Sequence, residues 1–281
     1  MSDAAEMHRR QIEAWNGPMG QQWAANEART ERNLAQVTQA LLGAAKAQPG
    51  ERVLDIGCGC GGSSVAFAAA VGPGGFVLGA DVSAPMLEVA KGTAPANAAY
   101  VLADAAAHAF EPAGFDLLVS RFGVMFFGDP DAAFANLRRA MKPGGRVAFA
   151  CWRPLAENPW VRVPMGALRA VLPEMPKPAG AEEPGPFAFG DRGRVTRILS
   201  AGGFTAPEFE AFDFDMRFPR DPAAAANAII QVGPAGRIMR EQPEAMRAAA
   251  MAAIAKAIAP FVKGDQIAMD GAVWLVTAKA S

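Results

Sequence analysis

The sequence predicts an α/β protein with a doubly wound, mostly parallel sheet. Between residues 49 and 152, short apolar segments alternate with helical segments, and the apolar segments lack the polar alternation of a half-exposed strand. Uniformly apolar strands separated by helices are typical of a parallel sheet that is covered on both faces. The first strand also ends in a glycine-rich turn before a helix, which lets a ligand approach the backbone.

An N-terminal helical arm over residues 1–48 precedes this sheet. Residues 26–42 carry apolar side chains at helical spacing with charges between them. A cluster of turn-forming residues at 15–20 interrupts the arm, and Trp15 and Trp23 bracket that turn. We expect the arm to pack over another part of the protein.

The core at residues 49–152 contains five predicted strands separated by helices and glycine turns. The expected strands cover residues 52–56, 76–80, 99–103, 115–120 and 146–152, and the expected helices cover 63–71, 84–91 and 131–141. A chain of 281 residues with 51% hydrophobic content can bury such a core plus an added layer. We therefore expect one catalytic domain with insertions.

Residues 153–281 are expected to complete the sheet and to cover it. A helix is predicted at 163–172 within a proline-rich stretch, and another helix at 192–201. A strand at 208–217, a long alanine- and methionine-rich helix at 222–258 and a final strand at 267–278 follow. We interpret residues 153–189 and 220–262 as lid insertions over the carboxyl edge of the sheet, where open α/β sheets bind ligands.

Composition and charge disfavour several functional classes. A net charge of −1 gives no general attraction to nucleic acid or to anionic membranes. No apolar run is long enough for a membrane span, and the amino terminus lacks the apolar core of a signal peptide. Three cysteines in 281 residues do not form a disulfide framework and suit a reducing compartment. We expect a cytoplasmic protein without a nucleic-acid partner.

Three acids stand at the ends of the first three predicted strands, namely Asp55, Asp81 and Asp104. The ends of these strands lie side by side in a doubly wound sheet, so we expect the acids to line one crevice. Asp81 stands where an acid accepts hydrogen bonds from both hydroxyls of an adenosine ribose. Three acids repel a pyrophosphate and favour a cation, which indicates a positively charged nucleoside.

Four motifs resemble those of the class I S-adenosylmethionine-dependent methyltransferases. They are the Asp-x-Gly-x-Gly-x-Gly loop at 55–61, Asp81, the Asp104-Ala105 pair and Lys142-Pro-Gly-Gly145. Residues 115–127 and the Trp15-Asn-Gly-Pro arm are similar to the ubiquinone and menaquinone biosynthesis type of small-molecule methyltransferase. The resemblance, which covers residues 50–152, implies a Rossmann-like sheet with an antiparallel last strand. It also implies S-adenosylmethionine as cofactor and S-adenosylhomocysteine as product.

The resemblance further implies the jobs of individual residues. In the family, the glycine loop approaches the methionine part of the cofactor, the acid after strand two takes the ribose, and the Asp-Ala pair takes the adenine. Cys60 departs from the family, which usually has threonine or another small residue there. The implied cofactor-binding residues are Asp55, Gly57, Cys58, Gly59, Asp81, Val82, Met86, Asp104, Ala105, Ser120 and Arg121.

The methyl acceptor is expected to lie among aromatic residues. Phe122 and Phe126 follow strand four, Trp152 ends strand five, and Trp15 and Trp23 come from the arm. We expect these residues, with Arg121, to line the substrate pocket. The predicted roof at 222–259 is mostly Ala, Ile and Met with few charges, which predicts a small apolar or aromatic metabolite as substrate, methylated by in-line displacement. The sulfonium already activates the methyl group, so the protein mainly supplies alignment and a dry pocket. No catalytic base is assigned, and a homodimer is one of the assemblies that the sequence leaves open.

Other interpretations of the same residues remain open. The aromatic residues could be ordinary core, and Asp104 could merely cap a turn. The three cysteines are interpreted as structural, and no metal is expected. His8 is interpreted as a solvated arm residue, and His108 as wall or surface. A cofactor-binding regulatory subunit of the same fold, which would bind the cofactor without a methyl acceptor, is the alternative function.

Overall fold

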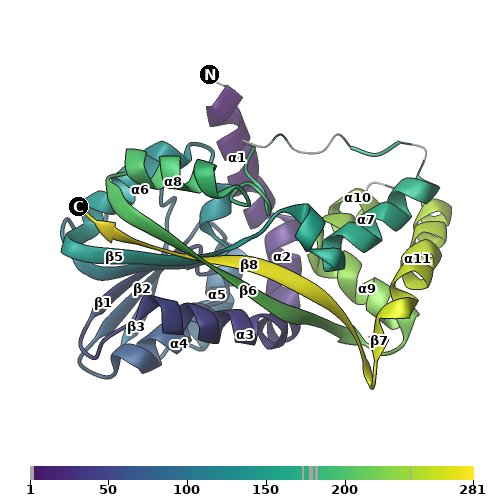
Figure 1. Ribbon diagram of the computed structural model, residues 1–281, viewed down its shortest axis with the longest axis horizontal. Coiled ribbons are helices and arrows are strands. Elements are labelled where there is room, and N and C mark those ends of the chain that lie inside the picture. Colours follow the sequence, from purple (N-terminus) through teal and green to yellow (C-terminus); the bar gives the residue numbers. More distant parts are fainter. Residues whose placement is uncertain (1–2, 173, 177–179, 181–182, 241) are drawn as a thin grey trace.

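The computed structural model describes residues 3–172, 174–176, 180, 183–240 and 242–281. Within these residues a mixed sheet of eight strands runs through the molecule, with helices on both of its faces (Figure 1). The strand order is β3-β2-β1-β4-β5-β8-β6, and the short strand β7 pairs with β8 beside this path. No described helix is both long enough and apolar enough to cross a membrane.

The first five strands are parallel and lie near their predicted positions. They are β1 (Arg52–Ile56), β2 (Phe76–Asp81), β3 (Ala98–Leu102), β4 (Phe115–Arg121) and β5 (Met141–Trp152). The chain moves outward from β1 to β2 and β3, and then returns to place β4 on the other side of β1. This reversal leaves a crevice at the carboxyl ends of β1 and β4, where open α/β sheets bind ligands.

Strand β5 begins five residues earlier than predicted. Met141 already pairs with Phe115, and a register shift follows before Arg146 pairs with Leu117. The Pro-Gly-Gly turn that was expected to precede the strand is therefore an irregular part of it. A proline inside a strand is tolerated at such an irregularity because it has no N–H to donate there.

The sheet ends in an antiparallel pair, which confirms the mostly parallel fold with an antiparallel last strand. β8 (Gln266–Ala280) runs antiparallel both to β5 and to β6 (Phe204–Pro219). β6 and β8 stay paired past the end of β5, and β7 (Val262–Lys263) joins at the far end. In Figure 1 this hairpin extends well beyond the parallel strands. β6 extends four residues before and two residues after its predicted span, and β8 extends one residue before and two after, because the two strands pair along nearly their whole length.

Helices cover the two faces of the parallel strands. α3 (Glu27–Ala45) and α4 (Gly62–Val71) lie on one face, and α6 (Pro130–Ala140) and α8 (Arg192–Ala201) lie on the other (Figure 1). α5 (Ala84–Gly92) packs against β3. The strands between these layers are fully buried at many positions, such as Leu54 and Leu118. This explains why their sequences are apolar without alternation.

The arm consists of three helices rather than two long ones around a broad turn. α1 (Asp3–Asn16) ends before Gly17, and α2 (Pro18–Ala25) starts with the proline, which suits the first turn of a helix. The predicted turn at 15–20 was therefore too wide, because residues 18–20 are helical. α3 follows after Asn26 and buries Leu34, Val37 and Leu41 against the sheet layer.

Four helices pack together beside the long hairpin, and we call them the helical lobe. They are α7 (Pro159–Val171), α9 (Pro222–Val232), α10 (Pro234–Arg240) and α11 (Glu244–Ile258) (Figure 1). The single helix predicted over 222–258 was wrong, because prolines begin new helices at Pro234 and just after Pro243. Short 3-10 turns connect other elements at η1 (Val124–Phe126), η2 (Leu155–Glu157) and η3 (Ala259–Phe261).

Candidate active site

The glycine turn after β1 brings bare backbone to the crevice. Gly57 and Gly59 have φ angles of +64° and +56°, a region that side chains other than glycine rarely adopt. A Cβ atom on Gly57 would stand 2.5 Å from the Cα of Gly123, and one on Gly59 would stand 2.8 Å from the Cε of Met86. The turn after β4 therefore lies directly against the turn after β1. Both positions require glycine for conformation and for space.

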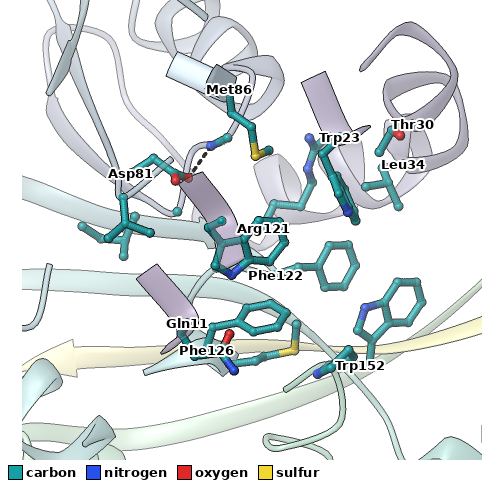
Figure 2. Close-up of a pocket in the computed structure, with 18 of the residues that line it drawn as sticks. Gln11, Trp23, Thr30, Leu34, Asp81, Met86, Arg121, Phe122, Phe126 and Trp152 are labelled. Carbon is teal, nitrogen blue, oxygen red and sulfur yellow. Dashed lines mark hydrogen bonds between the residues drawn. The ribbon is translucent and has the colours of Figure 1, made fainter. Parts of the chain in front are cut away.

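Asp81 at the end of β2 holds this turn in place. Its Oδ2 accepts a hydrogen bond of 2.8 Å from the Gly59 N–H (Figure 2). Its Oδ1 accepts one of 2.8 Å from the Ser83 N–H. Burial raises the pKa of Asp81, against the lowering effect of these hydrogen bonds. The residue also lines the cavity. It is thus an oriented acceptor at the wall of the cavity.

Asp55 lies behind the turn, and the described lining of the cavity does not include it. Its side chain is fully buried, and Oδ2 accepts hydrogen bonds from Ser63 Oγ at 2.7 Å and Ser64 Oγ at 2.6 Å. Oδ1 has no partner among the described residues. Burial raises the pKa of Asp55 to about 6. The three acids therefore do not share one crevice, and Asp55 instead fixes the start of α4 under the glycine turn.

Asp104 lies two residues past the end of β3, the neighbour of β2, where it lines the same cavity as Asp81 and contacts the arm. His8 Nε2 of α1 is 2.7 Å from Asp104 Oδ2, and Asp104 Oδ1 accepts a hydrogen bond of 3.0 Å from the Ala106 N–H. The interpretation of His8 as a solvated residue was wrong, because nothing in the sequence links it to an acid 96 positions away. Ala105 also lines the cavity.

Arg121 lines the cavity, but its charge is already paired. The guanidinium donates to both carboxylate oxygens of Glu31 and, at 2.7 Å, to Thr38 Oγ1. Only 8% of its side chain is exposed. Arg121 therefore ties the end of β4 to α3, and this fixes the position of the aromatic residue that follows it.

The five predicted aromatic residues all line one cavity. Figure 2 labels four of them, namely Trp23, Phe122, Phe126 and Trp152. The Phe122 and Trp152 rings stack in parallel with centroids 4.5 Å apart and 7° between their planes. Trp15 contacts Phe126 edge to face at 5.3 Å, and Trp23 at 6.0 Å. Phe122 has a φ angle of +70°, an uncommon conformation that turns its ring toward Trp152.

Some of the other predicted cofactor-binding residues line the cavity, and others lie behind it and hold its turns in place. Val82 and Met86 line the same cavity as Asp81, whereas Cys58 lines a smaller hollow beside the glycine turn. Ser120 is buried beneath the β4 turn, and its Oγ accepts the N–H groups of Gly123 and Val124. Ser120 therefore supports the turn from below.

Several wall residues were not predicted. They come from α3 and from the far hairpin and lobe, and they include Arg29, Thr30, Leu34, Met216, Phe218 and Pro234. The helical pattern of residues 26–42 could have indicated Thr30 and Leu34, which lie on the face that buries Leu41. No local signal marks Met216 or Phe218, because only the length of the β6–β8 hairpin brings them to the site.

Comparison with known proteins links this geometry to one kind of chemistry. Residues 53–145 match a family described as a methyltransferase domain. Nocamycin O-methyltransferase of Saccharothrix syringae is 29% identical over 194 residues, which cover 65% of this chain and 69% of that protein. The ubiquinone/menaquinone biosynthesis C-methyltransferase UbiE of Burkholderia mallei is 37% identical over 121 residues, which cover 40% of this chain and about half, 49%, of that protein.

Solved structures agree on the fold. The phosphoethanolamine N-methyltransferase 2 of Haemonchus contortus, solved in complex with S-adenosyl-L-methionine, aligns with a TM-score of 0.52 and 22% identity. The alignment covers 88% of this chain and 53% of that one. The similarity therefore extends past the glycine turn to most of the sheet and its helices.

Proposed function

Because the chain belongs to the class I S-adenosylmethionine-dependent methyltransferases, we propose that it methylates a small apolar or aromatic metabolite inside the cavity described above. One observation carries this proposal. A single cavity is bounded by the glycine turn and Asp81 at one side and by the stacked Phe122 and Trp152 at the other. Cofactor and acceptor would therefore meet in one cavity.

The residues of the crevice fit the cofactor. Asp81 is oriented by two backbone N–H groups and can still accept hydrogen bonds from ribose hydroxyls, because each carboxylate oxygen has two lone pairs. Asp104 has the same capacity for the adenine amine beside its contact with His8. The side-chain-free backbone of Gly57 and Gly59 leaves room for the methionine part. Bound there, S-adenosylmethionine supplies a methyl group on a positively charged sulfur.

The protein itself would hold the acceptor in line with the methyl group and exclude water from the cavity. Aligned reactants in a closed site account for on the order of 7–11 kcal/mol of a barrier. The faces of Phe122 and Trp152 can stabilise the dispersed positive charge of the transition state by roughly 0.5–2 kcal/mol. Helix α1 and the helical lobe cover the cavity through Trp15 and Trp160. We assign no catalytic base, because an in-line displacement at sulfonium does not require one.

The proposal is tested with S-adenosylmethionine that carries a labelled methyl group. The protein is incubated with this cofactor and a fractionated metabolite extract, and labelled products are identified by mass spectrometry. We expect one or a few small apolar or aromatic products, formed in smaller amount by the Asp81→Ala variant at limiting cofactor. Binding of S-adenosylhomocysteine without any labelled product in any fraction would instead support a cofactor-binding regulatory subunit. Failure to bind S-adenosylhomocysteine would contradict both.

A further inference from the structure

The charged residues in the wall of the large cavity are nearly all compensated. His8 contacts Asp104, Arg121 is paired with Glu31, and Asp81 accepts two backbone N–H groups. Among the residues that the structure describes, these groups leave one wall cation with no carboxylate partner. That cation is Arg29 on α3.

Among the described residues, the hydrogen-bond partners of the Arg29 side chain are neutral amide oxygens. Its guanidinium donates to Asn26 Oδ1 and, at 2.9 Å, to Gln231 Oε1 on α9. These bonds fix the side chain between the arm and the helical lobe and leave the charge unbalanced. Burial, followed by repulsion from Arg32, lowers the pKa of Arg29. A partly buried cation without an acid is costly, and an anionic ligand would offset that cost.

The adjacent residue adds a second unsatisfied group. Thr30 Oγ1 is out of contact with solvent and has no hydrogen-bond partner among the described residues. Thr30 lines the cavity on the same side as Trp23 and Leu34 (Figure 2). A buried hydroxyl in a native protein normally has a partner. A cation without an acid and an unsatisfied hydroxyl on successive residues of an apolar wall favour an anionic ligand such as a carboxylate.

Arg29 contacts the helical lobe. The smaller hollow beside the glycine turn is lined by Cys58, Cys60, Ser63 and Arg121, among others, and Thr30 lines it as well as the large cavity. The described lining of this hollow does not include Arg29, whose bond to Gln231 places the guanidinium where α3 meets the lobe. We therefore assign a carboxylate paired with Arg29 to the acceptor, and the affinity of Arg29→Gln for S-adenosylhomocysteine tests the alternative that it belongs to the cofactor.

We infer that the methyl acceptor carries a carboxylate that Arg29 and Thr30 bind, so that the substrate is an apolar or aromatic acid. This inference rests on the proposed function, because it assigns the chamber beside the cofactor to the acceptor. It also gives Arg29 a role in substrate selection. A neutral ligand of the same shape would leave the guanidinium without an anion and would bind less tightly.

The test uses benzoate, 2-naphthoate and the corresponding amides as probes, with saturating S-adenosylhomocysteine, in titration calorimetry. We expect at least one acid to bind on the order of tenfold more tightly than its amide, the size of one charge-assisted hydrogen bond. The Arg29→Gln variant should lose this preference and Arg29→Lys should keep part of it. Arg32→Gln is the matched control, because Arg32 is exposed on the same helix, and it should retain the preference.

Other outcomes would overturn the inference. Equal binding of acids and amides to the wild type, or no binding of either at millimolar concentration, contradicts it. A tenfold loss of S-adenosylhomocysteine affinity in Arg29→Gln would assign the guanidinium to the cofactor's carboxylate instead. Should Arg29→Gln fail to fold, Thr30→Val must reduce the preference in a folded protein. The titration is repeated without S-adenosylhomocysteine, so an acid preference supports the anion site even if failure to bind the cofactor product overturns the proposed function.

Discussion

The two sides of the cavity are built in different ways. On the sheet side, the turn of Gly57 and Gly59 and the carboxylate of Asp81 come from one segment of the chain, and backbone geometry sets their positions. On the other side, which we call the aromatic side, residues from distant segments meet, and side-chain packing sets their positions. They are Phe122, Trp152 and the residues of the helical lobe that line the cavity. Backbone geometry constrains the first side, so its residues are recognisable from the sequence, whereas side chains from distant segments assemble the second.

The largest effect is expected where the backbone of the sheet side is most constrained. Gly57→Ala places a methyl group 2.5 Å from the Cα of Gly123 and forces an alanine to a φ of +64°. We expect a loss of roughly 3 kcal/mol or more of unfolding free energy, since strain and overpacking each cost about 1–3 kcal/mol. Urea denaturation measures it. Gly144→Ala, also at positive φ but with nothing within 4 Å, should lose less.

The support beneath the turn should make stability depend on pH. Because the pKa of Asp55 is raised from 3.8 to about 6, the folded state keeps a proton that the unfolded chain has released in this range. Wild-type stability should therefore fall as the pH rises from 4 to 6, by up to about 3 kcal/mol at 1.36 kcal/mol per pKa unit. Asp55→Asn lacks this titration. A stability difference between the two proteins that is constant with pH would contradict the assignment.

Removing the proposed contact between Asp81 and the cofactor should cost less free energy than the two changes above. Asp81→Ala should weaken S-adenosylhomocysteine binding by on the order of 1–3 kcal/mol, the cost of leaving ribose hydroxyls unpaired. Calorimetry measures the affinity, and thermal unfolding shows whether the turn survives without its bond to Gly59. Unchanged affinity in a folded variant would remove Asp81 from the ribose site.

Substitutions on the aromatic side should change the binding of the acceptor and leave the binding of the cofactor unchanged. Trp152→Phe keeps an aromatic ring but reduces its stacking on Phe122, and aromatic pairs contribute about 0.5–1.5 kcal/mol. We expect the acceptor KM to rise by up to roughly tenfold, with S-adenosylhomocysteine affinity unchanged. Trp274→Phe is the control, because Trp274 lies on β8 and bonds to the Gly190 carbonyl. A change in cofactor affinity for Trp152→Phe would show that the two sides are not independent.

The sequence predicted elements best where local pattern and tertiary context agree. The strands of the core were found within a few residues, because fully buried strands are apolar at every position. The helix at 222–258 was predicted as continuous because its alanine content outweighed the glycine and prolines that divide it. Asp55 was wrongly predicted to line the crevice, because the position of a residue in a strand does not tell which way a buried carboxylate points.

The sequence by itself determined the glycine turn, the acids at the strand ends and the order of strands and helices, because these depend on residue type and short spacing. Only the tertiary structure decided the His8–Asp104 contact, the pairing of Arg121 with Glu31 and the unbalanced charge of Arg29. The physical reason is that each of these depends on a distance between segments far apart in the chain. Charge pairing across such distances leaves no periodic pattern in the sequence.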